Sequence, residues 1–137
     1  MTKRESILQA LKTVLDTVSG VTVYRSRVNA FLRSESPAIL LTWLRDSPSE
    51  DALGFLNWSM QFRVAVVTRG SVPDTTADTI VASVHNKLLT GTSLGGLTMD
   101  IIPAAADLQL IDADLEAGVV SSEFIAFYRT TRTDLTV

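Results

Sequence analysis

Three acidic side chains, Asp112, Asp114 and Glu116, stand at the alternate positions that open a calcium-binding loop. The loop pattern ends there, because Gly118 comes one place too late for the obligatory sharp turn and Glu123 is at the wrong distance for the closing bidentate ligand. Acidic residues are also common in hairpin turns, where their side chains accept hydrogen bonds from nearby backbone N–H groups. We therefore interpret residues 112–118 as a turn and predict no metal site.

A second segment, TGTSLGGL at residues 90–97, has the glycine content of a phosphate-binding loop. It lacks the Gly-Lys-Ser/Thr ending of such loops. It also leads into a strand pattern, so that no helix N-terminus would face a phosphate. We predict a plain connecting loop and no nucleotide cofactor.

The remaining residues suited to chemistry are His85, the only histidine, and two tryptophans, Trp43 and Trp58. The chain has no cysteine, which excludes thiolate ligands, disulfides and cysteine nucleophiles. A Ser-His-Asp triad is possible from the composition, but the Gly-x-Ser-x-Gly elbow is absent. Both tryptophans lie in strand patterns, where aromatic residues are enriched for packing. We interpret His85 as a boundary residue and predict that the protein is not an enzyme.

The chain of 137 residues has the length of one folded domain, and we expect a single domain over residues 1–137. Hydrophobic residues make up 46% of it and charged residues 20%, which is the balance of a folded protein. The net charge of -3 argues against a nucleic-acid-binding function, because such proteins need Lys and Arg to displace counterions from phosphates. Polar residues interrupt the apolar runs, so we expect neither a targeting signal nor a membrane span.

Two amphipathic helices are predicted by apolar residues at helical spacing. Thr2 and Glu5 have the spacing of a capping box at the start of the first helix, and Gly20 is a natural stop for it. Pro73 suits the first turn of the second helix, with Asp74 beside the positive end of the helix dipole. The apolar stripes are Ile7, Leu8, Leu11, Val14, Leu15 and Val18 in the first helix and Ala77, Ile80, Val81, Val84 and Leu88 in the second.

Five segments have strand patterns, so the predicted order is α-β-β-β-α-β-β. We expect an α+β fold in which two helices pack on a mainly antiparallel or mixed sheet of about five strands. The polar segment 46–54 is predicted to be an exposed loop, Pro103 a break or bulge, and 131–137 a mobile tail. The strands are expected at 21–24, 38–44, 58–66, 101–111 and 119–130, with the last two forming a hairpin.

The last of these strands is apolar on both faces. Phe124, Ala126 and Tyr128 alternate with Ile125 and Phe127. An antiparallel sheet in a two-layer domain normally buries one face only. Either helices cover both faces or another subunit covers one, and the presence of only two helices favours the second explanation.

Several sequence blocks and the order of elements resemble the phage tail terminator family, typified by minor tail protein U of lambda-like siphophages. The resemblance extends over residues 5–135 and has no catalytic signature. The blocks are PAILLTWL, WSMQFRVAVV, VPDTTADTIVASVHNKL, DADLEAGVVSSEF and IAFYRTTRTDL.

The resemblance implies a structural protein without cofactors that assembles into a homohexameric ring at the head-proximal end of a virion tail, in the cytoplasm of a bacterial host. Such a ring caps the tail tube, stops its polymerisation and offers a docking surface to the head. The implied partners are further copies of the chain, the major tail tube protein and a head-completion or connector protein, with no specific binding of nucleic acid and no membrane.

Two alternatives stay open: a head-closure or neck-ring protein of a phage, and a small soluble enzyme or ligand-binding domain with a site beside Trp43 and His85. For the ring, we expect contacts from the loops at 46–54 and 69–74, the doubly apolar strand and the tail, since loops on a rigid scaffold often mediate recognition. The candidate interface residues are Asp46, Glu50, Asp51, Arg69, Asp74, Phe124, Ile125, Phe127, Arg129 and Arg132.

Overall fold

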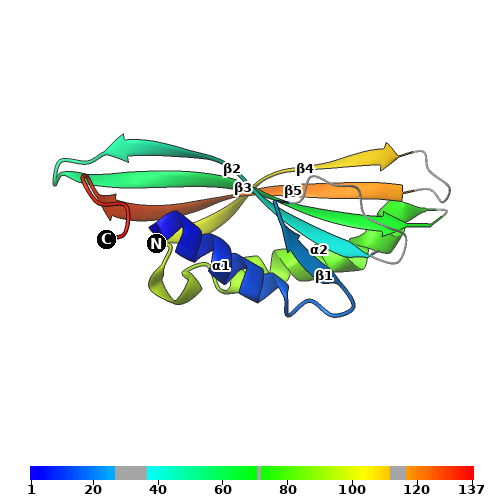
Figure 1. Cartoon of the computed structure of the whole chain (residues 1–137). Helices are drawn as coiled ribbons and strands as arrows, with labels where there is room; N and C mark the ends of the chain where they lie inside the picture. Colours follow the sequence, from blue (N-terminus) through cyan, green and yellow to red (C-terminus); the bar gives the residue numbers. More distant parts are fainter. Residues whose placement is uncertain (27–36, 71, 112–116) are drawn as a thin grey trace.

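A computed structural model describes residues 1–26, 37–70, 72–111 and 117–137 of the chain (Figure 1). It confirms the predicted fold class and order of elements, with two helices and one five-stranded mixed sheet. The elements are α1 (Lys3–Leu15), β1 (Thr22–Arg25), β2 (Ala38–Glu50), β3 (Phe55–Arg69), α2 (Pro73–Thr90), the 3-10 helix η2 (Leu94–Gly96), β4 (Asp100–Ile111) and β5 (Ala117–Thr131).

The strands follow the order β1-β2-β3-β5-β4 across the sheet. β1 pairs in parallel with the start of β2, and every other pairing is antiparallel. Both helices lie on the same side of the sheet (Figure 1). The other side has no helix among the described residues, and we call it the helix-free face. β3 and β5 lie in the middle of the sheet and position everything that follows.

The core lies between the sheet and the two helices. β3 alternates as the sequence predicts, so that Met60, Phe62 and Val64 are fully buried toward the helices. Phe62 stacks on Phe124 of β5, with ring centroids 5.6 Å apart. Burying an aromatic side chain of this size stabilises the fold by about 1.5–3 kcal/mol.

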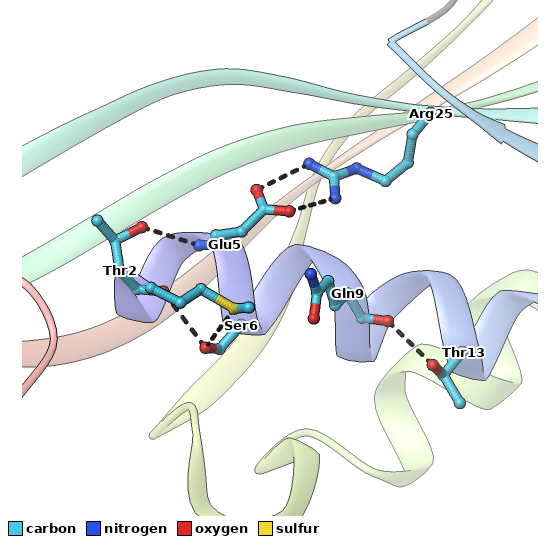
Figure 2. A network of polar contacts seen from close by, with 7 residues as sticks. Thr2, Glu5, Ser6, Gln9, Thr13 and Arg25 are labelled. Atoms are coloured by element: carbon cyan, nitrogen blue, oxygen red, sulfur yellow. Dashed lines mark hydrogen bonds and ion pairs between the residues drawn. The ribbon is translucent and has the colours of Figure 1, made fainter.

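The first helix begins as predicted and ends earlier than expected (Figure 2). The Thr2 hydroxyl accepts a hydrogen bond from the Glu5 backbone N–H at 3.2 Å, which satisfies one of the free donors at the helix start. The Glu5 carboxylate instead pairs with Arg25, with Nη1 2.8 Å and Nη2 3.1 Å from its two oxygens. The helix ends at Leu15, although Val18 is still buried and Gly20 adopts a positive φ of 78°.

The prediction of a loop over 46–54 was wrong for its first half. β2 continues to Glu50, and the turn to β3 needs only the residues around Gly54, which has a φ of 81°. Pro48 pairs with Trp58 inside this strand. Proline is tolerated there because β1 pairs with β2 only as far as Leu41, so that the next part of β2 has no described neighbour on that side.

The end of the chain also differs from the prediction of a mobile tail, because residues 131–137 fold back on the protein. The Thr131 N–H donates to the Val137 carbonyl at 2.8 Å, and the Lys3 N–H donates to the Leu135 carbonyl at 2.9 Å. The predicted irregularity in β4 is confirmed, since the register shifts between Pro103 and Ala105. The predicted turn at 112–118 lies mostly outside the described residues.

Candidate assembly interface

β5 places apolar side chains on both faces of the sheet. Phe124 and Tyr128 point toward the helices and are buried, whereas Ile125 and Phe127 point to the helix-free face and are half-buried. Ile102 of β4 stands opposite Ile125 in the register and is 38% exposed. These three residues form an apolar strip on a sheet face that no described helix covers.

Polar and charged groups adjoin this strip. Gln61 donates a hydrogen bond to Glu123 at 2.8 Å, and an Arg63 Nη lies 3.8 Å from the same carboxylate. The Nε of Arg63 is buried without a hydrogen-bond partner among the described residues. A buried donor without an acceptor lowers stability, so an acceptor from a partner surface that reached this N–H would stabilise the contact.

A hollow of about 310 Å³ opens beside the strip, which we call the Arg45 hollow. Arg45 lies opposite Gln61 of β3, on the part of β2 that β1 does not reach, and forms no ion pair within the described part of the chain. The surrounding hydroxyl and amide groups can donate hydrogen bonds, so the hollow suits a negatively charged group. Its lining residues are Arg45, Ser47, Ser59, Gln61 and Ile125.

The helix side of the sheet has a groove between α2 and β4. Two hollows of about 390 and 470 Å³ share Val81 and Ala106, and together they form this groove. We call its first hollow the acidic groove, because the carboxylates of Asp74 and Asp78 on α2 line it and make no ion pair to any described residue. It is lined by Asp74, Asp78, Val81, Ala106, Asp107, Leu108 and Val120.

Asp46 does not lie at an exposed loop tip. Its side chain is only 7% exposed and accepts hydrogen bonds from Trp43 Nε1 at 2.9 Å and from the Tyr128 hydroxyl at 2.6 Å. Arg4 lies 3.8 Å away and stacks over the Trp43 ring at 4.3 Å. Burial and the hydrogen bond to Asp46 raise the pKa of the Tyr128 hydroxyl. The geometry of Asp46 suits an internal structural role.

The other charged candidates fall at opposite ends of the sheet. Arg132 pairs with Glu50, and Arg129 lies 3.3 Å from Asp51, at the end that holds the turn between β2 and β3. Arg69 ends β3 and Asp74 lies in the first turn of α2 at the other end (Figure 1). Apart from Asp46 and Phe124, which are largely buried, the predicted interface residues therefore form three groups, including the apolar pair on β5.

Sequence reasoning missed three residues with unpaired charges, Arg45, Asp78 and Asp107. No motif marks them, because whether a charge is paired depends on which strands become neighbours.

His85 is exposed, with its ring centroid 6.4 Å from that of Phe124, and it lines the second hollow of the groove. The described residues contain no group of three or more potential metal ligands. Neither of the described helices is long and apolar enough to cross a membrane.

No protein-family model matches the chain, and no curated protein sequence matches it. Solved structures do match, and 37 chains are similar to it. One belongs to the virion of a native gene transfer agent (GTA) particle. It aligns with a TM-score of 0.57 and 17% identity, over 88% of this chain and 84% of the other. At this identity the match shows that the two chains share a fold.

Proposed function

We propose that this chain is a structural protein of a phage or prophage tail, specifically a ring-forming tail terminator. In this role a homohexamer caps the head-proximal end of the tail tube, stops tube polymerisation and offers a docking surface to the head. Its partners are further copies of itself, the major tail tube protein and a head-completion or connector protein.

The observation that carries the proposal is the apolar strip on β5 and β4. Ile125, Phe127 and the 38%-exposed Ile102 lie on a sheet face without a described helix, which is a position that favours association with another protein surface. The fold shared with a chain of a virion particle supports a structural role. The sequence blocks that resemble tail terminators support the more specific role of a protein at the end of the tail tube.

The mechanism needs no catalyst, since it is steric. A ring whose lower face matches the end of the tube binds there and occupies the site of the next tube subunit. Because its upper face differs from a tube subunit, no further subunit can add. The turn between β2 and β3 and the start of α2 lie at opposite ends of the sheet and are suited to contacts along the ring axis (Figure 1).

The test is assembly and tube capping. Light scattering across protein concentration is expected to show a closed oligomer with six times the mass of the 14.9 kDa chain, on its own or when tube ends are added as a template. Each contact is expected to bury more than roughly 1,000 Å². A chain that stays monomeric at high concentration and also fails to bind tube ends would contradict the proposal. Binding to isolated heads without binding to tubes would indicate a neck-ring protein.

A further inference from the structure

We propose that the ring closes through a head-to-tail contact in which α2 of one copy docks on the helix-free face of the next, with Asp78 entering the Arg45 hollow. This inference rests on the proposed function and adds to it by naming the two surfaces that meet. The occupant of the hollow is thus a second copy of this chain.

The lining residues of the Arg45 hollow include no carboxylate, although Glu123 lies beside it and accepts a hydrogen bond from Gln61. Arg45 is exposed and makes no ion pair to a described residue, and Ser47, Ser59 and Gln61 surround the same hollow with groups that can donate hydrogen bonds. A carboxylate that enters the hollow would gain a charge-assisted hydrogen bond. The neighbouring apolar strip supplies the surface whose burial stabilises the contact.

The donating surface lacks a cation. Asp74 and Asp78 stand one turn apart on the outside of α2. Both are exposed, and neither forms an ion pair with a described residue. Leu108, 46% exposed beside them on β4, adds an apolar contact. The charge and the apolar character of this surface thus complement those of the Arg45 hollow.

The two surfaces cannot meet within one copy. α2 lies on the helix side of the sheet (Figure 1). The register places the residues that line the Arg45 hollow on the helix-free face. Complementary patches on different sides of a subunit produce a heterologous contact, which closes into a ring when the rotation between copies divides a full turn. This geometry therefore favours a cyclic assembly over a two-fold dimer.

The test reverses each charge and then combines the two variants. Arg45→Glu places two carboxylates in one contact, and Asp78→Lys places two cations there, so each variant alone is expected to self-associate roughly a hundredfold more weakly than the wild type. In an equimolar mixture the copies alternate around an even-membered ring, and every contact again joins opposite charges. The mixture is therefore expected to recover the mass of the wild-type assembly by light scattering.

Matched controls exist at the end of α1. Lys12→Glu and Asp16→Lys make the same changes of charge in a pair joined at 3.1 Å that lines neither the Arg45 hollow nor the acidic groove, and they are expected to leave assembly unchanged. Circular dichroism verifies folding, and Arg45→Gln with Asp78→Asn repeats the test without repulsion if a reversal unfolds the chain. Unchanged assembly of the single variants, or a mixture that fails to recover, would overturn this contact while leaving the tail terminator proposal intact. Failure of the wild type to assemble or to bind tube ends would overturn both.

Discussion

The hydroxyl of Tyr128 donates a hydrogen bond to Oδ2 of Asp46 over 2.6 Å, although 82 residues separate the two along the chain. The bond links β5 to β2 across β3, and the Asp46 side chain is only 7% exposed. A loop residue predicted to face a partner is thus part of the packing that holds the sheet together.

Tyr128→Phe is expected to lower the free energy of unfolding by about 1–2 kcal/mol, because it leaves the shielded Asp46 carboxylate with one donor fewer. Urea unfolding of Tyr128→Phe, Asp46→Asn and the double variant measures the coupling between them. Additive losses would show that the hydrogen bond contributes nothing of its own.

Phe124→Ala and Phe127→Ala on the same strand are expected to affect different properties, the first mainly stability and the second mainly assembly. Phe124 is 2% exposed in the core, so its truncation should lower the free energy of unfolding by about 3–5 kcal/mol. Phe127 is half-buried, so Phe127→Ala should lower the free energy of unfolding by only about 1 kcal/mol, the typical value for a single substitution, but weaken self-association markedly. Urea titration and light scattering measure the two effects, and intact assembly of Phe127→Ala would contradict the interface assignment.

The pair between Glu5 and Arg25 makes stability depend on pH. The hydrogen bond from Arg25 lowers the pKa of the Glu5 carboxyl from its usual 4.5, so the folded state binds this proton less readily than the unfolded state. The stabilisation is fully present above about pH 4.5 and is lost as the pH falls through the lowered pKa. Since Glu5 is 39% exposed, solvent screening limits the contribution to about 0.5 kcal/mol.

Arg25→Gln should therefore be less stable than the wild type at pH 7 and equally stable in strong acid. Thermal unfolding across pH checks this. A stability difference that stays the same from pH 7 into strong acid would exclude the ion pair as its cause.

His85→Ala is expected to leave the fold and tail assembly unchanged. The ring is exposed on α2 and its nearest described aromatic neighbour, Phe124, is 6.4 Å away between centroids. Electron microscopy of tails assembled with the variant provides the measurement. Loss of assembly with an intact circular dichroism spectrum would assign His85 a function.

In the proposed hexameric ring, through which DNA would pass, six copies would carry a formal charge of -18, so the ring is expected to bind duplex DNA weakly at physiological salt. Asp46 is largely buried, so Glu50 is the better residue of that segment to reverse. Glu50→Lys should slow DNA ejection more than it alters tail length. Tight binding by the unmodified ring in a salt titration would favour a neck protein that grips the genome.

The helices and the alternating strand could be predicted from the sequence because each depends on local periodicity. The stripe of α1, its cap at Thr2 and the faces of β3 follow from spacing alone. The extent of β2 could not, since Pro48 and the acids near it are typical of a turn. β2 accommodates Pro48 and these acids because this part of the strand pairs with β3 on one side, with Trp58 opposite Pro48, and has no β1 neighbour on the other.

Part of the candidate interface could be predicted from the sequence in the same way. The alternation along β5 predicted two apolar faces but not which of them the helices cover, so the candidates included Phe124, which is buried, together with Ile125 and Phe127. The sequence could not identify Arg45 and Asp78 as candidates, because they are distinguished only by having no ion-pair partner among the described residues. Whether such a partner exists depends on the order of the strands and on the position of α2.

The separation of β3 from β5 along the chain has a consequence for synthesis on the ribosome. β3 ends at Arg69 and its central neighbour β5 begins at Ala117, so one side of β3 has no partner while the intervening segment is translated, roughly 2–10 seconds at typical rates. During this interval Met60 and Phe62 can be covered by α1, by the newly made α2 and by the hairpin with β2, but Phe124 and the rest of β5 are not yet present. A slow codon stretch between these strands would prolong the exposure and favour aggregation of the nascent chain.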